Sequence, residues 1–164
     1  MGKEFINLKS ELIKCCGSEK WADEMLKNCQ FNSEEQLYQT SDKIWYSLDK
    51  TDWLEAFSHH PKIGDLNSLK EKFSSTKHLA ENEQSGVNSA SELTLNELSK
   101  YNDDYEKKFG FIFIVCASGK TADEMLSLIK ERILNNPEDE IKIAMKEQNK
   151  ITNLRLNKNL NKFI

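Results

Sequence analysis

Apolar residues recur at intervals of three and four along most of this chain. Near the amino terminus, one such stripe consists of Phe5, Leu8, Leu12 and Ile13. This spacing gathers apolar side chains on one face of an α-helix, and that face has to be buried against other helices. The 164 residues contain only 2 prolines and 6 glycines, so few positions interrupt the pattern. The sequence therefore predicts an all-α fold, a single compact multi-helix bundle domain over residues 1–164 with about seven to nine helices.

Several residues mark the ends of the expected helices. Gly17 suits a helix stop, because glycine readily adopts the left-handed conformation that commonly follows a helix. Ser18, Ser33 and Thr51 suit the N-cap position, where a side-chain oxygen accepts from a free backbone N–H. Gln36 follows Ser33 by three residues, which fits a capping box.

Three later segments complete the expected fold. A polar helix with a narrow apolar face is expected over 94–109. The last helix is expected over 137–160, with Pro137 at its first position, where the missing N–H costs nothing. Phe111–Cys116 is apolar throughout, which predicts burial but leaves open whether the segment is a strand or the start of a helix.

Charge and composition exclude several classes of protein. The net charge of −4 and the pI near 5.5 argue against a domain that binds nucleic acid. No apolar run approaches the ~18 residues of a membrane span. The 4 cysteines form no CxxC pair and have no histidine at metal-ligand spacing, so they are expected to be buried thiols and no metal site is expected. Without a secretory signal or a peroxisomal tripeptide in this sequence, a cytoplasmic location is expected.

Arg155 is the most constrained charge in the sequence. It falls near the middle of the apolar arc of the last helix, with Gln148 beside it. A guanidinium in that position cannot lose its charge, so it needs an anionic or hydrogen-bonding partner. Two interpretations remain open, a clamp for an anionic ligand and one half of a buried structural ion pair. The other arginine, Arg132, lies in the last turn of its helix, where the helix dipole alone explains it.

Two further clusters carry groups that could do chemistry. His60 precedes Pro61, which ends the preceding helix and holds the histidine in an extended conformation. An imidazole presented in this way could transfer protons near neutral pH, although a capping or surface histidine is the commoner case. Glu83 and Gln84 could bind N–H and C=O groups of a ligand, although a polar helix end stopped by Gly86 is the simpler interpretation.

Several motifs together resemble one known family. HPKIGD at 60–65, EQSG at 83–86, FGFIFIVCASGK at 109–120 and ITNLRL at 151–156 resemble the OHCU decarboxylase family, which acts on 2-oxo-4-hydroxy-4-carboxy-5-ureidoimidazoline in the uric acid pathway. CGSEKWADEM at 16–25 and DWLEAFSHHP at 52–61 are also similar to the amino-terminal half of that family. The resemblance extends over nearly the whole chain in the right order.

This resemblance implies an all-helical fold, commonly a homodimer, a small-molecule substrate, and no metal or organic cofactor. It implies a catalytic role for His60, Glu83 and Arg155. It also implies substrate contacts, largely through the backbone in the last stretch, at Pro61, Gln84, Val115, Cys116, Ala117, Ser118 and Gly119. Several members of the family carry Pro in place of Ile112 and Arg in place of Ser118, so a side-chain contact at 118 is not carried over.

Two alternative functions remain open at this point. A non-catalytic helical interaction module would pair Arg155 with Glu83 or another carboxylate in a closed core. A related cofactor-free hydrolase of a ureide or an imidazoline would use the same histidine, glutamate and arginine.

Overall fold

The computed structural model describes residues 2–62, 67, 69, 71 and 87–164. Within these residues the chain forms helices and no strand, which confirms the predicted all-α class. The helices are α1 (Gly2–Cys16), α2 (Glu19–Lys27), α3 (Glu34–Ser47), α4 (Lys50–Ser58), α6 (Val87–Phe109), α7 (Ala122–Arg132), α8 (Pro137–Lys158) and the short 3-10 helix η1 (Leu160–Lys162). None of these helices combines the length and the apolar character that a bilayer span needs.

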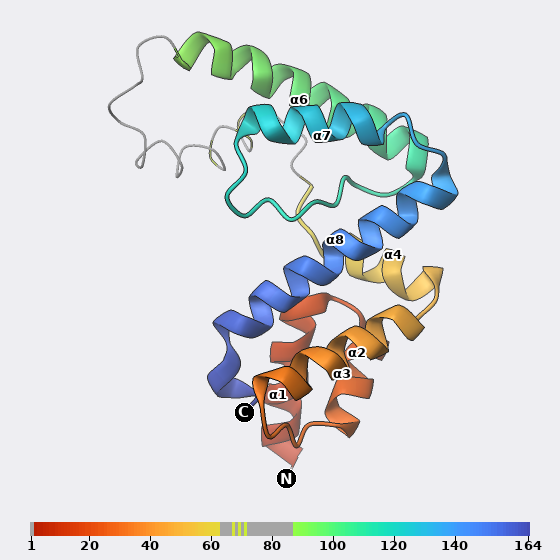
Figure 1. The fold of residues 1–164 in the computed structure, drawn as a ribbon, viewed down its shortest axis with the longest axis vertical. Helices are drawn as coiled ribbons and strands as arrows, with labels where there is room; N and C mark the ends of the chain where they lie inside the picture. The colour runs from red at the N-terminus through yellow and green to blue at the C-terminus, as the bar shows by residue number, and fades with distance from the viewer. Residues whose placement is uncertain (1, 63–66, 68, 70, 72–86) are drawn as a thin grey trace. The chain divides into compact units, whose positions relative to one another are not determined.

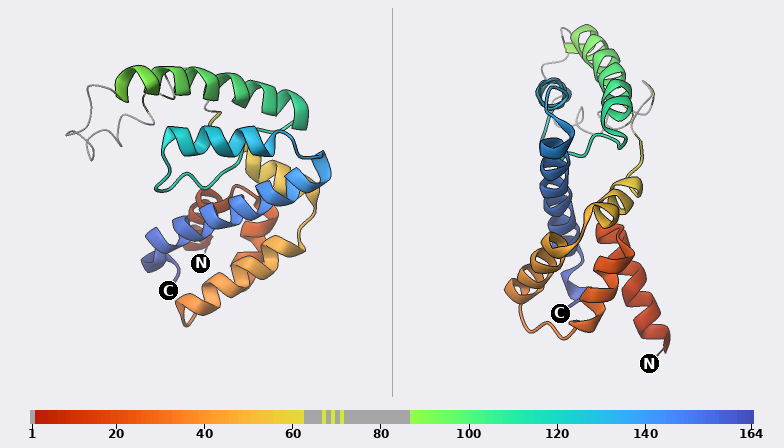
Figure 2. Two further views of the ribbon diagram at one scale, coloured as in Figure 1. Left: turned by 45° about the horizontal axis from the view of Figure 1, so that its top comes forward. Right: turned by 90° about the vertical axis from the view of Figure 1, so that its right-hand side faces the viewer.

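The chain divides into two compact units, and a single domain over 1–164 stays a prediction. Unit 1 consists of Met1–His60, Ile114–Cys116 and Lys142–Ile164, and unit 2 consists of Pro61–Phe113 and Ala117–Ile141. In unit 1, helices α1 to α4 gather around the carboxyl-terminal part of α8 (Figures 1 and 2). In unit 2, α6 and α7 lie side by side (Figures 1 and 2).

Three tryptophans tie the helices of unit 1 together. The indole N–H of Trp21 donates to Ser41 O at 3.3 Å, and that of Trp45 donates to Met145 O at 2.9 Å. Trp53 donates in turn to Trp45 O at 3.2 Å. Trp21 and Trp45 are almost completely buried, and these bonds leave no unpaired indole N–H in the core. The contacts join α2 to α3, α3 to α8 and α4 to α3.

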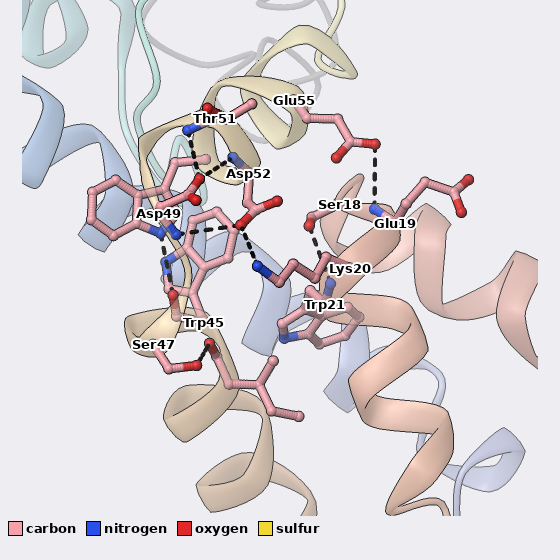
Figure 3. Close-up of polar contacts among 12 residues, drawn as sticks. Ser18, Glu19, Lys20, Trp21, Trp45, Ser47, Asp49, Thr51, Asp52 and Glu55 are labelled. Atoms are coloured by element: carbon pink, nitrogen blue, oxygen red, sulfur yellow. Dashed lines mark hydrogen bonds and ion pairs between the residues drawn. The ribbon is translucent and has the colours of Figure 1, made fainter.

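The predicted N-cap residues are confirmed for two helices, and the prediction for a third is wrong. Ser18 and Ser33 each accept from the backbone N–H three residues ahead, as predicted. The Gln36 side chain accepts from Asn32 N, one residue before the expected position. Thr51 is not the N-cap of α4. That role belongs to Asp49, a stronger capping residue, which accepts from the N–H groups of Thr51 and Asp52 (Figure 3).

Two other boundaries differ from the prediction. Helix α6 begins at Val87, seven residues before the expected start, and the sequence from 87 to 93 contains no glycine or proline to stop it. Phe111–Cys116 forms neither a strand nor a helix. It follows Gly110, whose φ of +80° ends α6, and its burial is confirmed at Ile114 and Val115. Pro137 begins α8, as predicted.

The buried arginine of the described residues is Arg132, which corrects the expectation that the helix dipole explains it. Arg132 is 6% exposed and Glu140 is completely buried. The guanidinium donates to the Glu140 carboxylate from Nε at 2.7 Å and from Nη2 at 2.6 Å. Tyr105 and Asn135 also donate to this carboxylate, and Arg132 lies over the ring of Phe113. Unit 2 therefore contains a buried ion pair whose carboxylate is well supplied with donors.

Candidate functional site

One face of α8 carries the polar groups that organise the candidate site in unit 1. Gln148, Thr152 and Arg155 are spaced at i, i+4 and i+7, so their side chains follow one another along the same side of the helix. At ~1.5 Å per residue, Gln148 and Arg155 are separated by about 10 Å along the axis. Gln148 and Thr152 are buried, and Arg155 is half-buried.

His60 lies at the end of α4 and contacts this face. The helix ends at Ser58, and His60 N donates to Phe57 O at 3.2 Å, so the last turn of the helix sets the position of the histidine. The half-buried imidazole is hydrogen-bonded through Nε2 to Gln148 Oε1. The histidine predicted as the catalytic group is thus attached to a helix 88 residues further along the chain.

Gln148 is itself anchored to α1 and to its own helix. Its amide nitrogen donates to Cys16 O at 3.5 Å and to Thr152 Oγ1 at 3.2 Å. Burial raises the pKa of the Cys16 thiol to about 12, so this sulfur stays protonated and is not a nucleophile at neutral pH. The neighbouring Cys15 is similar, because burial raises its pKa to about 11. The cysteines here serve as buried packing groups, as predicted.

Arg155 binds the carboxyl-terminal end of α1. Its Nη1 donates to Lys14 O and to Cys15 O, each at 3.3 Å. The final carbonyls of a helix carry a partial negative charge, which favours a guanidinium there. In the part of the chain that the structure describes, no carboxylate lies within ion-pair distance of Arg155. The partners of Arg155 in this region are therefore carbonyls, and no described carboxylate neutralises its charge.

The apolar segment that precedes α7 is also attached to α8. Cys116 N donates to the Glu147 carboxylate at 3.4 Å, and the other oxygen of that carboxylate pairs with Lys150 at 2.6 Å. Val115 and Cys116 are buried. Glu147 therefore binds Cys116, one of the predicted substrate-contacting positions, and Gln148 binds the predicted catalytic histidine.

The predicted site residues are distributed over both units and over residues outside the described part of the chain. Pro61, Ala117, Ser118 and Gly119 belong to unit 2, where Ser118 and Gly119 are exposed in a turn and Gly119 has a φ of +73°. Glu83 and Gln84 lie outside the described residues. Of the predicted catalytic groups, His60 and Arg155 thus lie in unit 1, where Arg155 is on the polar face of α8 and His60 bonds to Gln148 of that face. Within the described ranges, no cluster of histidine, cysteine and carboxylate side chains is arranged to hold a metal ion.

Sequence reasoning missed the supporting residues. Gln148 was noted only as a neighbour of Arg155, Gly17 only as a helix stop, and Glu147 was not singled out. The one available signal was the polar amide of Gln148 on the apolar arc of the last helix, since such a group needs buried partners.

Gly17 is expected to tolerate no side chain. Its φ is +82°, and a Cβ there would lie 2.8 Å from His59 Cβ and 3.2 Å from Ala56 O. Gly17→Ala should therefore lower the free energy of unfolding by about 1–3 kcal/mol and disturb the end of α4 next to His60. Urea denaturation and an activity assay measure the two effects.

Gly110→Ala is the matched control for this substitution. Gly110 has a φ of +80°, but nothing lies within 4 Å of a Cβ built there. It carries the conformational cost without the collision, so equal losses in the two variants would contradict the steric argument.

Comparisons with known proteins agree with the resemblance seen in the motifs. The model of the family described as OHCU decarboxylase matches residues 5–157. The uric acid degradation bifunctional protein TTL of Arabidopsis thaliana is 43% identical over 145 residues, which are 88% of this chain and 44% of that protein. The uric acid degradation bifunctional protein of Bacillus sp. (strain TB-90) is 30% identical over 154 residues, which are 93% of this chain and 29% of that protein. The chain thus spans less than half the length of these two relatives.

A solved structure extends the similarity to the fold. It is described as OHCU decarboxylase in the presence of (S)-allantoin, is 39% identical to this chain, and aligns with a TM-score of 0.72 over 92% of this chain and 97% of that one. A second structure, described as (S)-allantoin synthase, is 20% identical with a TM-score of 0.68 and supports the fold alone. The family model, the curated relatives and the solved structure together show that the chain belongs to the OHCU decarboxylase family.

Proposed function

We propose that this chain decarboxylates 2-oxo-4-hydroxy-4-carboxy-5-ureidoimidazoline (OHCU) to (S)-allantoin in uric acid degradation, without a metal or an organic cofactor. Family membership supports the reaction class. The observation that carries the proposal is the placement of two residues: His60 bonds to Gln148 on one face of α8, and Arg155 lies on the same face and donates to the end of α1. The imidazole supplies a proton-transfer group and the guanidinium an anion-binding group, and this reaction needs both.

The reaction requires the protein to orient the substrate and to deliver one proton to a defined face of it. The bond between the ring carbon and the carboxylate breaks, CO₂ leaves, and the bonding pair is delocalised over the adjacent C=N bond of the substrate. The former C=N nitrogen takes a proton, and the resulting enol loses its hydroxyl proton as the oxygen becomes a carbonyl. A proton delivered on one face to the neighbouring carbon then creates the stereocentre of (S)-allantoin. We assign this delivery to His60, a general-acid role that typically contributes ~10²–10⁴-fold to the rate.

Arg155 and the remaining predicted residues would bind the substrate. Among the described contacts of Arg155, Nη1 alone donates, so the rest of its planar donor fork can hold an anionic or carbonyl group of the ligand. We assign the ureido and ring N–H groups to Glu83 and Gln84, and further contacts to Pro61 and, through the backbone, to Val115–Gly119. These assignments rest on the family resemblance.

Arg155→Lys is expected to lower kcat/KM by roughly 10–100-fold although the charge is kept. Lysine offers one ammonium group in place of a fork that donates both to the end of α1 and to a ligand. Losing one charge-assisted hydrogen bond of about 1.5–3 kcal/mol corresponds to this range. Steady-state kinetics measures the loss, and Lys158→Arg, an exchange near the end of the same helix, serves as the control. Full activity in Arg155→Lys would contradict the assignment of Arg155 as the clamp.

The proposed function is tested with substrate that is generated in the assay mixture. Urate is oxidised by uricase and hydroxyisourate hydrolase, the purified chain is added, and circular dichroism follows the appearance of optically active allantoin. A dichroic signal that scales with the chain supports the decarboxylase. Consumption of the substrate without optically active allantoin would point to the hydrolase, and no consumption at all would point to the interaction module.

Assembly and location complete the proposal. We propose a homodimer, which the family resemblance implies, and a cytoplasmic location. Light scattering on the eluting protein measures the mass of the assembly, and a single-chain mass of 19.0 kDa would contradict the homodimer.

A further inference from the structure

We propose that Gln148 is a positioning residue that holds the His60 imidazole with a proton on Nε2 and so leaves Nδ1 as the nitrogen that exchanges protons with the substrate. This inference rests on the proposed function, in which His60 delivers the proton. It concerns a residue outside the catalytic and substrate-contacting set that the family resemblance implies.

The surroundings of Gln148 show that its amide is held in one orientation. Gln148 is completely buried, and both ends of its amide have partners. Cys16 O is a carbonyl oxygen and only accepts hydrogen bonds, so the group that faces it must be the NH₂ of the amide. Thr152 Oγ1, at 3.2 Å from the same nitrogen, is compatible with that assignment. The carbonyl oxygen of the amide therefore faces His60.

This orientation decides which nitrogen of His60 is protonated. Gln148 Oε1 is an acceptor only, so the His60 Nε2 that bonds to it must carry a hydrogen. In the neutral ring Nδ1 is then the nitrogen without a proton, and in the cation Nδ1 carries the second one. The proton that comes and goes is the one on Nδ1, because releasing the Nε2 proton would leave two acceptors facing each other in a buried place.

The arrangement also fixes the ring in space. Gln148 is bonded to α1 through Cys16 O, and Arg155 is bonded to the same end of α1 through Lys14 O and Cys15 O. Gln148, which holds the imidazole, and the guanidinium of Arg155 are thus both hydrogen-bonded to the last turn of α1. At metal sites, removing a partner that orients a ligating imidazole typically costs 10–100-fold in metal affinity or activity, and we expect an effect of that order here.

Nitrogen NMR of the unmodified chain tests the inference directly. The chain has 3 histidines, so a sample labelled with ¹⁵N at histidine gives three imidazole patterns in a long-range ¹H–¹⁵N spectrum, and loss of one pattern in His60→Asn assigns His60. At a pH where this ring is neutral, we expect a protonated Nε2 and an unprotonated Nδ1. A neutral His60 that is protonated on Nδ1 would overturn the inference, and this measurement requires no variant of Gln148 to fold.

Variants of Gln148 then test the consequence for catalysis. Gln148→Leu removes the acceptor and should give a mixture of the two tautomers and a kcat lowered by about tenfold or more, with a smaller change in KM. Gln148→Glu keeps an oxygen in front of Nε2 and should keep the Nε2-protonated form. If Gln148→Leu keeps a single Nε2-protonated form and the wild-type kcat, Gln148 does not position the ring.

Asn149→Leu is the matched control. It removes a buried amide from the next position of α8, but this amide bonds to Asp42 and Tyr46 instead of His60. An equal loss of kcat in Asn149→Leu would overturn the inference, because it would show that any buried amide of α8 has the same effect. Failure of the proposed function can be told apart from failure of this inference. If the proposed function is wrong, the wild-type chain is inactive whichever tautomer His60 adopts.

Discussion

Replacing His60 with asparagine is expected to lower the turnover of OHCU by at least about 100-fold while the helical fold is retained. The asparagine amide can still donate to Gln148 Oε1, so the contact between the end of α4 and α8 has a substitute. It has no group that takes up and releases a proton near neutral pH, so the directed protonation of carbon is lost. The dichroism assay measures both the rate and the optical purity of the allantoin.

His59→Asn is the matched control for this variant. His59 is exposed, adjacent in sequence, and keeps the Cβ that packs against Gly17 when asparagine replaces it. We expect its turnover to stay close to that of the wild type and the far-ultraviolet spectra of both variants to match. Stereoselective turnover at the wild-type rate in His60→Asn would remove this histidine from the mechanism.

Replacing Arg132 with leucine is expected to lower the free energy of unfolding by about 3–5 kcal/mol. The Glu140 carboxylate would remain completely buried without its cationic partner, and only the neutral donors of Tyr105 and Asn135 would be left. Burial raises the pKa of Tyr105 well above its usual value, so the hydroxyl remains a donor and cannot add a second negative charge. Urea denaturation measures the loss, which corresponds to a fall in Tm of roughly 6–20 °C for a chain of this size.

Two further variants separate the buried charge from other effects. Lys130, on α7 like Arg132, forms an exposed pair with Glu97 of α6, and Lys130→Leu should cost less than about 1 kcal/mol. The double variant Arg132→Leu with Glu140→Leu removes both charges and should recover part of the loss, because it leaves no unpaired carboxylate in the core. A loss in Arg132→Leu no larger than that in Lys130→Leu would contradict the argument.

The local features of the fold could be predicted from the sequence because short-range interactions decide them. A glycine after a helix, a serine before one and a proline at a first turn act within a few residues, and Gly17, Ser18 and Pro137 were assigned correctly for that reason. Thr51 was assigned wrongly because Asp49 competes for the same free N–H groups and binds them better. The helical period of the apolar residues alone cannot decide between two N-cap candidates that lie two residues apart.

The partners of the two arginines could not be predicted, since they depend on contacts between distant segments. For Arg155 the sequence leaves two interpretations open, a clamp for an anionic ligand and a buried ion pair, and in the described region the guanidinium donates to carbonyls of α1. Arg132 was attributed to its own helix, whereas it pairs with Glu140 of the next one. The roles of Glu83 and Gln84 stay predictions, because both lie outside the described residues. The resemblance to a family supplied the site residues, and the residues that support them became visible only in three dimensions.

The assembly of unit 1 from segments far apart in the sequence has a consequence for how the protein is made. Gln148 leaves the ribosome 88 residues after His60, a delay of roughly 4–18 s at ordinary rates of translation. During that interval the nascent chain has already produced helices α1 to α4, but the helix that immobilises the imidazole does not yet exist. The contact between His60 and Gln148 therefore forms late in synthesis, when α8 docks, and the apolar faces of the earlier helices depend until then on one another or on a chaperone.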